Sequence, residues 1–357
     1  MIDARQRVLR AALIGTGQIA RQHLRCLREL PDVEIAAVCD LSPGLAECAA
    51  ERFGVPRWFR DHRALLAEVR PDVVHVTTPP TSHFHLTMDA LDAGAHVIVE
   101  KPITTTLTEL AALNSRALEN NLTIVENYNY LFNEQIIRIL EYIANGELGA
   151  VTGVNIDICL DILGKGSSFA DPNLPHPCLS MAGGAIADFL PHLASLAHCF
   201  VGSHRSARTV WTKRSSSPLP SDEFRALVDA EGGIATLGFS ASSQPDAFWV
   251  RVQGERMHAS ANLFETRLTI NRLRDGPKPL RPLRDALDEA KTIRRAAYKT
   301  LWRKLEGGAA SYEGLWTLIA ETYYAIAHDG TPPVTPKQMI EVNHLIDDLK
   351  PVEISQP

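Results

Sequence analysis

The sequence lacks the features that mark several large protein classes. Its six cysteines include no Cys-x-x-Cys pair and no zinc-ligand spacing, so we expect neither a disulfide framework nor a zinc centre, and predict small buried apolar cysteines in a reducing compartment. No apolar run approaches membrane-spanning length, and the N-terminal segment has no apolar stretch typical of a signal peptide. We therefore expect a cytoplasmic protein without a membrane partner.

An excess of basic charge is also absent. The chain has 36 Lys and Arg residues and 42 Asp and Glu residues, which gives a formal net charge of −6. This balance argues against a general attraction to nucleic acid or to anionic membranes. The chain has 357 residues, of which 45% are hydrophobic, so it can bury large cores and is long enough for two domains.

Residues 8–126 repeat a strand-then-helix pattern. Apolar β-rich runs such as VLRAALIG, VEIAAVCD and AHVIVEKP alternate with segments of helical periodicity, several of which end at a glycine. Strands that alternate with helices indicate right-handed βαβ units and a parallel sheet. We predict an α/β, doubly wound Rossmann domain over residues 1–126.

The pattern changes from residue 127. A predicted helix is followed by β-rich segments at short spacing, and Gly232–Gly233 between two of them is typical of a hairpin turn. This spacing indicates a second, α+β domain over residues 127–357 with a large, mostly antiparallel open sheet. A basic helical insert occupies about 276–310, and we expect one face of it to pack through Leu287, Ala290, Ile293, Ala297, Leu301 and Leu305. An oligomer contact or a phosphate-attracting face is the alternative for this insert.

A Gly-x-Gly-x-x-Ala run, GTGQIA, begins at Gly15, directly after the first predicted strand and at the start of the first predicted helix. In this context the first glycine permits a tight turn, the second lets the backbone approach a pyrophosphate, and the alanine lets the helix pack close to the sheet. Free N–H groups at the helix N-terminus then bind the phosphates. The predicted contacts to the dinucleotide are Gly15, Gly17, Gln18 and Ile19.

Asp40 closes the second predicted strand, about twenty residues after the glycine run, where a carboxylate accepts hydrogen bonds from the adenosine ribose. The alternative is an ordinary turn aspartate before Ser42. A 2′-phosphate would be repelled by this carboxylate, and positions 41–46 hold no Arg or Lys to offset the repulsion. We predict NAD as the cofactor in preference to NADP.

Three further motifs follow in order: Thr78-Pro79-Pro80 with His83, Glu100-Lys101-Pro102, and GGAIADFLPH, which ends at His192. Together with the glycine run, they resemble the glucose-fructose oxidoreductase/inositol dehydrogenase (Gfo/Idh/MocA) family, which joins an N-terminal Rossmann domain to an α+β C-terminal domain. The resemblance covers nearly the whole chain except about 276–310. It implies cofactor contacts near the nicotinamide from Thr78, Pro79, His83, Glu100 and Lys101.

The residue types in these motifs suit the oxidation of a secondary alcohol. A histidine can take the hydroxyl proton while hydride leaves the same carbon, and a lysine at the carboxyl rim of a parallel sheet can stabilise charge on the reacting oxygen. By the resemblance, His192 is the acid/base, Lys101 polarises the oxygen, and Asp188 binds the substrate or orients His192. The alternatives are a loop-start lysine and a surface helix pair. His83 and His85 have no third ligand near them in sequence, so we expect no metal site.

The sequence departs from the family pattern around the substrate. Leu190 stands where the family often has glycine, Ser195 where an aspartate often follows the histidine, and Pro191 should kink the predicted helix. A stretch that begins with Asn127 and Tyr128 replaces an aromatic-Arg-aromatic run, and these two residues are candidate substrate contacts. Lys165 and His176, in a Gly-, Ser- and Pro-rich loop, are further candidates, with an ordinary surface loop as the alternative.

These observations predict an NAD(H)-dependent oxidoreductase that moves hydride between nicotinamide and a secondary hydroxyl carbon of a sugar, cyclitol or nucleotide sugar. A redox-neutral lyase or glycosidase that uses tightly held NAD is one alternative, and a non-catalytic ligand-binding regulator is the other. By the resemblance, we also expect a homodimer or homotetramer. No nucleic-acid partner is expected.

Overall fold

The computed structural model describes residues 7–164, 167, 169, 177–179, 183–265, 267–272, 281–305 and 312–351. The chain divides into two compact units, Met1–Asn129 with Leu315–Ile340, and Tyr130–Gly314 with Glu341–Pro357. The first boundary lies close to the one predicted at residue 126. The return of 315–340 to the first unit was not predicted, because an amphipathic helix does not encode in its own pattern which surface it covers.

The first unit contains a six-stranded sheet in the order β3-β2-β1-β4-β5-β6, with every neighbouring pair parallel. In chain order its strands are Leu9–Ile14, Val33–Cys39, Trp58–Phe59, Val73–Val76, His96–Val99 and Ile124–Glu126. The order reverses between β1 and β4, and ligands bind outside the carboxyl ends of the strands at such a point. The doubly wound prediction is therefore confirmed; only the two-residue strand β3 was not foreseen.

Helices connect these strands, as the sequence pattern predicted. They are α1 (Ala20–Glu29), α2 (Pro43–Phe53), α3 (His62–Val69), α4 (His83–Asp92) and α5 (Leu107–Glu119), with α9 (Glu313–Ala327) added from the C-terminal part of the chain. The predicted C-cap glycine of α2, Gly54, has a left-handed conformation (φ 68°) that glycine adopts without strain. Thr106 and Glu109 form a capping box that begins α5.

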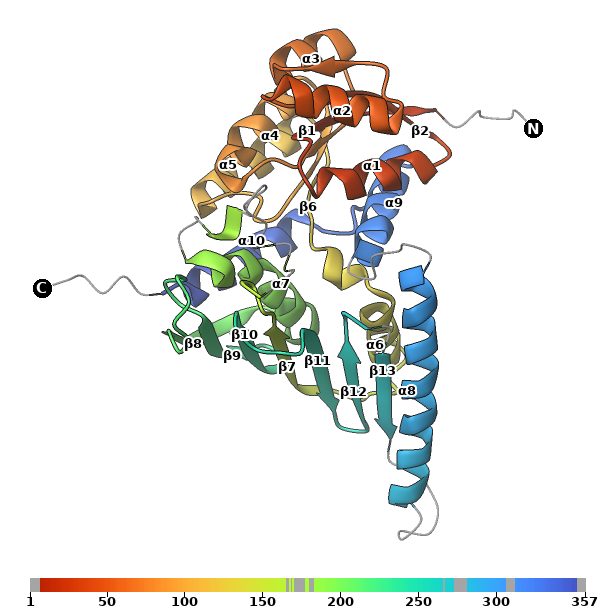
Figure 1. Cartoon of the computed structure of the whole chain (residues 1–357), viewed down its shortest axis with the longest axis vertical. Coiled ribbons are helices and arrows are strands. Elements are labelled where there is room, and N and C mark those ends of the chain that lie inside the picture. The colour runs from red at the N-terminus through yellow and green to blue at the C-terminus, as the bar shows by residue number, and fades with distance from the viewer. Residues whose placement is uncertain are drawn as a thin grey trace, which may run out of the picture. The chain divides into compact units, whose positions relative to one another are not determined.

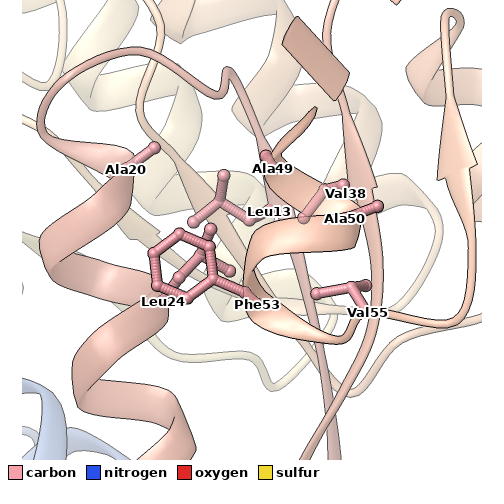
Figure 2. Close-up of a cluster of buried hydrophobic side chains, with 8 residues drawn as sticks. All are labelled: Leu13, Ala20, Leu24, Val38, Ala49, Ala50, Phe53 and Val55. Atoms are coloured by element: carbon pink, nitrogen blue, oxygen red, sulfur yellow. The ribbon is translucent and has the colours of Figure 1, made fainter. Parts of the chain in front are cut away.

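A cluster of buried apolar side chains fixes α1 and α2 against the sheet (Figure 2). Leu13 and Val38 come from β1 and β2, and they meet side chains of α1 and α2 around Leu24 and Phe53. The remaining members are Ala20, Ala49, Ala50 and Val55. Small residues at the contacts let the helices approach the sheet closely, which holds the start of α1 at the end of β1.

The second unit contains a seven-stranded sheet in the order β13-β12-β11-β7-β10-β9-β8. In chain order its strands are Val151–Cys159, His204–Thr212, Glu223–Ala230, Gly233–Ser240, Ala247–Gly254, Met257–Asn262 and Arg267–Arg272. All pairs are antiparallel except β7 with β10, which is parallel. The predicted hairpin at Gly232–Gly233 joins β9 to β10, and the mostly antiparallel sheet is confirmed.

Helix α7 (Gly184–Val201) packs against β7 and β10 of this sheet and continues through Pro191 as one helix. It is long and apolar enough to cross a membrane by length and composition, which corrects the expectation that no run approaches that length. Because 83% of it is buried inside the structure, α7 has the character of a core helix. The unit also contains α6 (Glu134–Ala144), and α10 (Pro336–Leu349) ends the helical part of the chain.

Helix α8 (Arg281–Leu305) runs beside β13 (Figure 1). The face that we expected to pack is instead exposed: Leu287, Leu301 and Leu305 are all large exposed apolar residues. The less exposed positions are Asp285, Thr292, Ala296 and Thr300. The prediction was wrong because periodicity identifies an apolar face but not the surface it meets.

None of the six cysteines, which all lie among the described residues, forms a disulfide bond. Cys26, Cys39 and Cys178 are buried as predicted, and burial raises the pKa of Cys26 to about 12, which disfavours the thiolate. Cys48 corrects the prediction because it is exposed on α2, while Cys159 and Cys199 are partly buried. Their thiols therefore differ in access to solvent.

The α1–α2 cluster makes a first prediction. Replacing the buried Leu24 by alanine (Leu24→Ala) should lower the free energy of unfolding by about 2–5 kcal/mol, because it leaves a cavity that the neighbours fill only in part. Urea unfolding followed by circular dichroism measures this change. The control is Leu118→Ala on α5, where the side chain is 82% exposed, and a change below about 0.5 kcal/mol is expected. Equal effects of the two substitutions would contradict the packing described.

Candidate functional site

The turn between β1 and α1 requires glycine at position 15. Gly15 has φ +93°, and a Cβ atom there would lie 2.7 Å from Thr78 Cγ2 and 2.9 Å from the Thr77 carbonyl oxygen. Thr77 also donates a hydrogen bond from Oγ1 to the Gly15 carbonyl oxygen at 2.6 Å. The end of β1 is thus held directly against the segment that follows β4, at the point where the strand order reverses.

The start of α1 has open space around Gly17 and lacks a side-chain cap. A Cβ atom at Gly17 would have no neighbour within 4 Å, so the backbone there is open to a ligand. Ile19, the N-cap of α1, forms no side-chain cap, and the first turn carries no acidic residue. The first N–H groups of the helix and the positive end of its dipole therefore have no anionic partner from α1 itself. This arrangement fits a pyrophosphate, with Gly15, Gly17, Gln18 and Ile19 around it.

Asp40 lies beside this turn. Its Oδ2 accepts hydrogen bonds from the Thr16 backbone N–H at 2.8 Å and from Thr16 Oγ1 at 2.9 Å, while Oδ1 accepts one from the Ser42 backbone N–H at 2.9 Å. The carboxylate that we predicted to contact the ribose is thus positioned by the glycine turn itself. Its contact with a ribose stays a prediction.

Glu100 and Lys101 follow β5 at the carboxyl edge of the sheet. Glu100 is buried, and its Oε1 lies 2.9 Å from His23 Nε2 and accepts a hydrogen bond from Asn127 Nδ2 at 2.5 Å. Burial alone would raise the pKa of this carboxyl, but the hydrogen bond and charge of His23, the Asn127 amide and the Lys101 ammonium hold the pKa below its ordinary value. Glu100 is therefore a buried carboxylate next to Lys101, which is partly exposed.

The loop after β4 is tied to the loop after β5 by His83. Its Nδ1 lies 2.7 Å from the Pro102 carbonyl oxygen, and its Nε2 lies 2.7 Å from the Thr78 carbonyl oxygen. Burial lowers the pKa of this imidazole despite the two carbonyls. His83 has no exposed surface and supports these loops, and its direct contact with the cofactor stays a prediction. Thr78 is partly exposed and Pro79 is exposed, so both remain accessible to a ligand.

Asn127 and Tyr128 also lie beneath the loops and not at the surface. Asn127 holds Glu100, and the fully buried Tyr128 donates a hydrogen bond from its hydroxyl to Glu126 Oε2 at 2.7 Å. Glu126 in turn accepts a hydrogen bond from the backbone N–H of Ile103 at 3.2 Å. Both side chains brace the Glu100–Lys101 segment from beneath, and their contact with a substrate stays a prediction.

In the second unit, Asp188 and His192 lie one turn apart on α7, and both side chains are largely buried. The His192 ring meets the Tyr130 ring edge to face at a centroid distance of 4.7 Å, and Phe189 lies on another side at 5.8 Å. Burial raises the pKa of Tyr130, and Tyr312 and the charge of Asp188 add to the rise. Because α7 continues through Pro191, the i,i+4 relation of Asp188 and His192 is kept.

Sequence reasoning missed three residues of the first unit that are linked to Glu100: His23 on α1, His75 in β4, and Tyr323 on α9. The available signal was a histidine within each of two otherwise apolar patterns, VVHV and the buried face of α1.

Lys165 and His176 lie outside the described residues. Among the described residues, no group of three His, Cys, Asp or Glu side chains could hold a metal ion.

Residues 9–128 match the Gfo/Idh/MocA family model, which is described as an oxidoreductase family with an NAD-binding Rossmann fold. This segment belongs to that family. The match spans the glycine turn, Asp40 and the Glu100–Lys101 segment, so the Gfo/Idh/MocA assignment agrees with the geometry of the first unit.

Two of the similar proteins are named as sugar dehydrogenases. D-glucoside 3-dehydrogenase of Escherichia coli K12 is 33% identical over 144 residues, which are 40% of this chain and 41% of that protein. Levoglucosan dehydrogenase of Pseudarthrobacter phenanthrenivorans is 28% identical over 243 residues, which are 64% of this chain and 61% of that protein. The chain thus spans less than two thirds of the length of these relatives.

Solved structures share the fold along both units. A levoglucosan dehydrogenase in complex with NADH aligns with a TM-score of 0.73 and 19% identity, and 96% of this chain and 95% of that chain are covered. UDP-N-acetylglucosamine 3-dehydrogenase from Acidithiobacillus ferrooxidans aligns with a TM-score of 0.73 and 21% identity, with 96% of each chain covered. At this identity, the likeness establishes the architecture.

The glycine turn makes the second prediction. Gly15→Ala should weaken NAD binding at least about tenfold, because the added methyl group strains a left-handed backbone and meets the Thr77 carbonyl. Isothermal titration calorimetry measures the affinity. Gly44→Ala on α2 is the matched control, since a Cβ atom there has no neighbour within 4 Å and alanine favours a helix. Unchanged binding by Gly15→Ala would exclude this turn as the pyrophosphate site.

Proposed function

We propose that this protein is an NAD(H)-dependent oxidoreductase that interconverts a secondary alcohol and a ketone on a carbohydrate-like substrate. The observation that carries the proposal is the carboxyl edge of the first sheet. There an uncapped helix start, the Asp40 carboxylate and the Glu100–Lys101 pair follow β1, β2 and β5 of one sheet. The helix start suits the pyrophosphate of a dinucleotide, the carboxylate suits its ribose, and the ammonium suits the charge on a reacting oxygen.

Bound NAD supplies the hydride chemistry, and the chain's own groups handle the oxygen and the proton. In the proposal, the Lys101 ammonium donates a hydrogen bond to the reacting oxygen and stabilises the negative charge that grows there. His192 takes the hydroxyl proton during oxidation and returns it during reduction. Asp188 lies one turn before His192 on α7, where it orients the imidazole or binds a substrate hydroxyl.

The substrate proposal is a ring hydroxyl of a sugar, cyclitol or nucleotide sugar. It is supported by relatives named as dehydrogenases of glucosides and levoglucosan. Tyr130 and Phe189, whose rings meet His192, provide an apolar surround that strengthens polar contacts to a bound hydroxyl.

Asp40 generates the third prediction, which concerns the choice between NAD and NADP. The unaltered protein should bind NAD about a hundredfold more tightly than NADP, because the carboxylate accepts ribose hydroxyls and repels a 2′-phosphate. Asp40→Ala should lose about tenfold in NAD affinity and gain in NADP affinity. Asp40→Asn, which keeps the shape and removes the charge, should mainly improve NADP binding. Calorimetric titration of each cofactor measures these affinities, and an unaltered protein that prefers NADP would overturn the assignment.

His192 generates the fourth prediction. In a panel of sugars, inositols and nucleotide sugars, at least one compound should reduce NAD. The absorbance of reduced nicotinamide measures this reaction. His192→Ala should lower kcat by at least about a hundredfold, because the proton loses its acceptor. His344→Ala, at an exposed histidine of α10, is the control and should leave kcat unchanged.

Two other results of this panel would replace the proposal. Substrate consumption without net change in nicotinamide absorbance would indicate the redox-neutral lyase or glycosidase. Binding of NAD and sugar without any turnover, together with normal binding by Lys101→Ala, would indicate a regulator.

A further inference from the structure

A row of four polar side chains crosses the interior of the first unit. His23 Nε2 lies 2.9 Å from Glu100 Oε1, His23 Nδ1 lies 2.8 Å from His75 Nδ1, and His75 Nε2 lies 3.0 Å from the Tyr323 hydroxyl. The two histidines are 0% exposed, Tyr323 is 4% exposed and Glu100 is 8% exposed. The row therefore joins α9 through β4 and α1 to the end of β5, with no room for bulk water between its members.

A Rossmann core does not need such a row for stability. His75 stands among Val73, Val74 and Val76 in a central strand, and His23 shares its helix face with Leu24 and Leu27. Apolar side chains at these positions would pack without the cost of burying polar atoms. The cost is offset here because each ring nitrogen of the two histidines has a partner.

The protonation states follow from the partners. Burial and the neighbouring His23 hold the pKa of His75 far below its ordinary value, so His75 is neutral and has one N–H. Burial, with Cys26 and Asp72, raises the pKa of Tyr323, so its hydroxyl keeps its proton. With neutral His23, the hydrogen bonds run from Tyr323 to His75 to His23 to Glu100. With protonated His23, the hydrogen bonds run from His23 to His75 and from His75 to Tyr323, and His23 still donates to Glu100.

We propose that His23 is a positioning residue for the reaction: held through His75 by Tyr323, it fixes the Glu100 carboxylate beside Lys101. This inference rests on the proposed function for its catalytic consequence. Glu100 then presents a constant negative charge to the ammonium that polarises the reacting oxygen, and α9 becomes part of the support of the active site.

The groups that face Glu100 determine what happens when His23 is removed. They are His23 from α1, Asn127 after β6, Lys101 in the same loop, and His83 from α4, which feels the charge of Glu100. His23 provides the largest influence that lowers the Glu100 pKa, and burial opposes it. In His23→Leu the effect of burial prevails, so the pKa of Glu100 rises. The carboxyl is then ionised above the raised pKa and takes up a proton as the pH falls through it.

The first measurement does not depend on turnover. In protein labelled with carbon-13 at the glutamate carboxyl, NMR follows the Glu100 resonance between about pH 8 and pH 5.5, with Glu100→Gln for its assignment. It should stay at the carboxylate position in the unaltered protein and move to the protonated position in His23→Leu. His23→Gln should resemble the unaltered protein, because its amide can donate to Glu100 and accept from His75. A Glu100 resonance that stays ionised in His23→Leu would overturn the proposal.

The second measurement uses the far end of the row. Tyr323→Phe removes one hydroxyl without touching Glu100, and it also serves if His23→Leu does not fold. It should lower kcat about tenfold and leave KM for NAD nearly unchanged. The substitution weakens the row of hydrogen bonds that holds the Glu100 carboxylate and does not touch the cofactor contacts. Tyr324→Phe is the matched control, because this neighbouring tyrosine is exposed and should leave kcat as it is.

The pH profile separates positioning from a general loss of structure. In His23→Leu, kcat/KM should fall more steeply than in the unaltered protein as the pH decreases from about 8 to 6, and His23→Gln should restore the unaltered profile. If the Glu100 resonance moves but kcat and its profile do not, the positioning role is wrong. If no sugar reduces NAD and the resonance still moves in His23→Leu, the proposed function is wrong, but the inference that His23 keeps Glu100 ionised is supported.

Discussion

The structure of the cofactor site depends on the close approach of Gly15 to Thr77 and Thr78. At this point β1 and β4 diverge into helices, and the Gly15 backbone takes a conformation in which any side chain would meet the Thr77 carbonyl. The Thr77 hydroxyl bonds back to Gly15, and Thr16 positions Asp40. A single backbone contact thus sets the positions of the turn, the start of α1 and the carboxylate.

A second layer of buried polar groups supports the loops after β4, β5 and β6. His83 lies between the first two loops, 2.7 Å from a carbonyl oxygen of each, and Glu126 accepts a hydrogen bond from the backbone N–H of Ile103. Glu100 is held by side chains from α1 and from the segment after β6. Because these groups are buried, each lost hydrogen bond leaves an unpaired polar atom with no water to replace its partner. The loops therefore keep their shape while the Lys101 side chain remains partly exposed.

The positions of several predicted groups agree with the structure for a common reason. The glycine turn, Asp40 and the Glu100–Lys101 segment each lie where a strand ends, and the alternation of strands with helices places the strand ends on one edge of a parallel sheet. The pair Asp188 and His192 likewise depends only on helical spacing, which Pro191 did not interrupt. Where position along one element was sufficient, the sequence was a good guide.

The fold class, the glycine turn and the order of the motifs could be predicted from the sequence, because these depend on periodicity and on local backbone requirements. The folded chain was needed to show which face of α8 is exposed, that His83, Asn127 and Tyr128 lie under the loops, and that α9 returns to the first unit. It alone joined His23, His75 and Tyr323 to Glu100. Such pairings arise between elements distant along the chain, and the pattern within one element does not encode its partner.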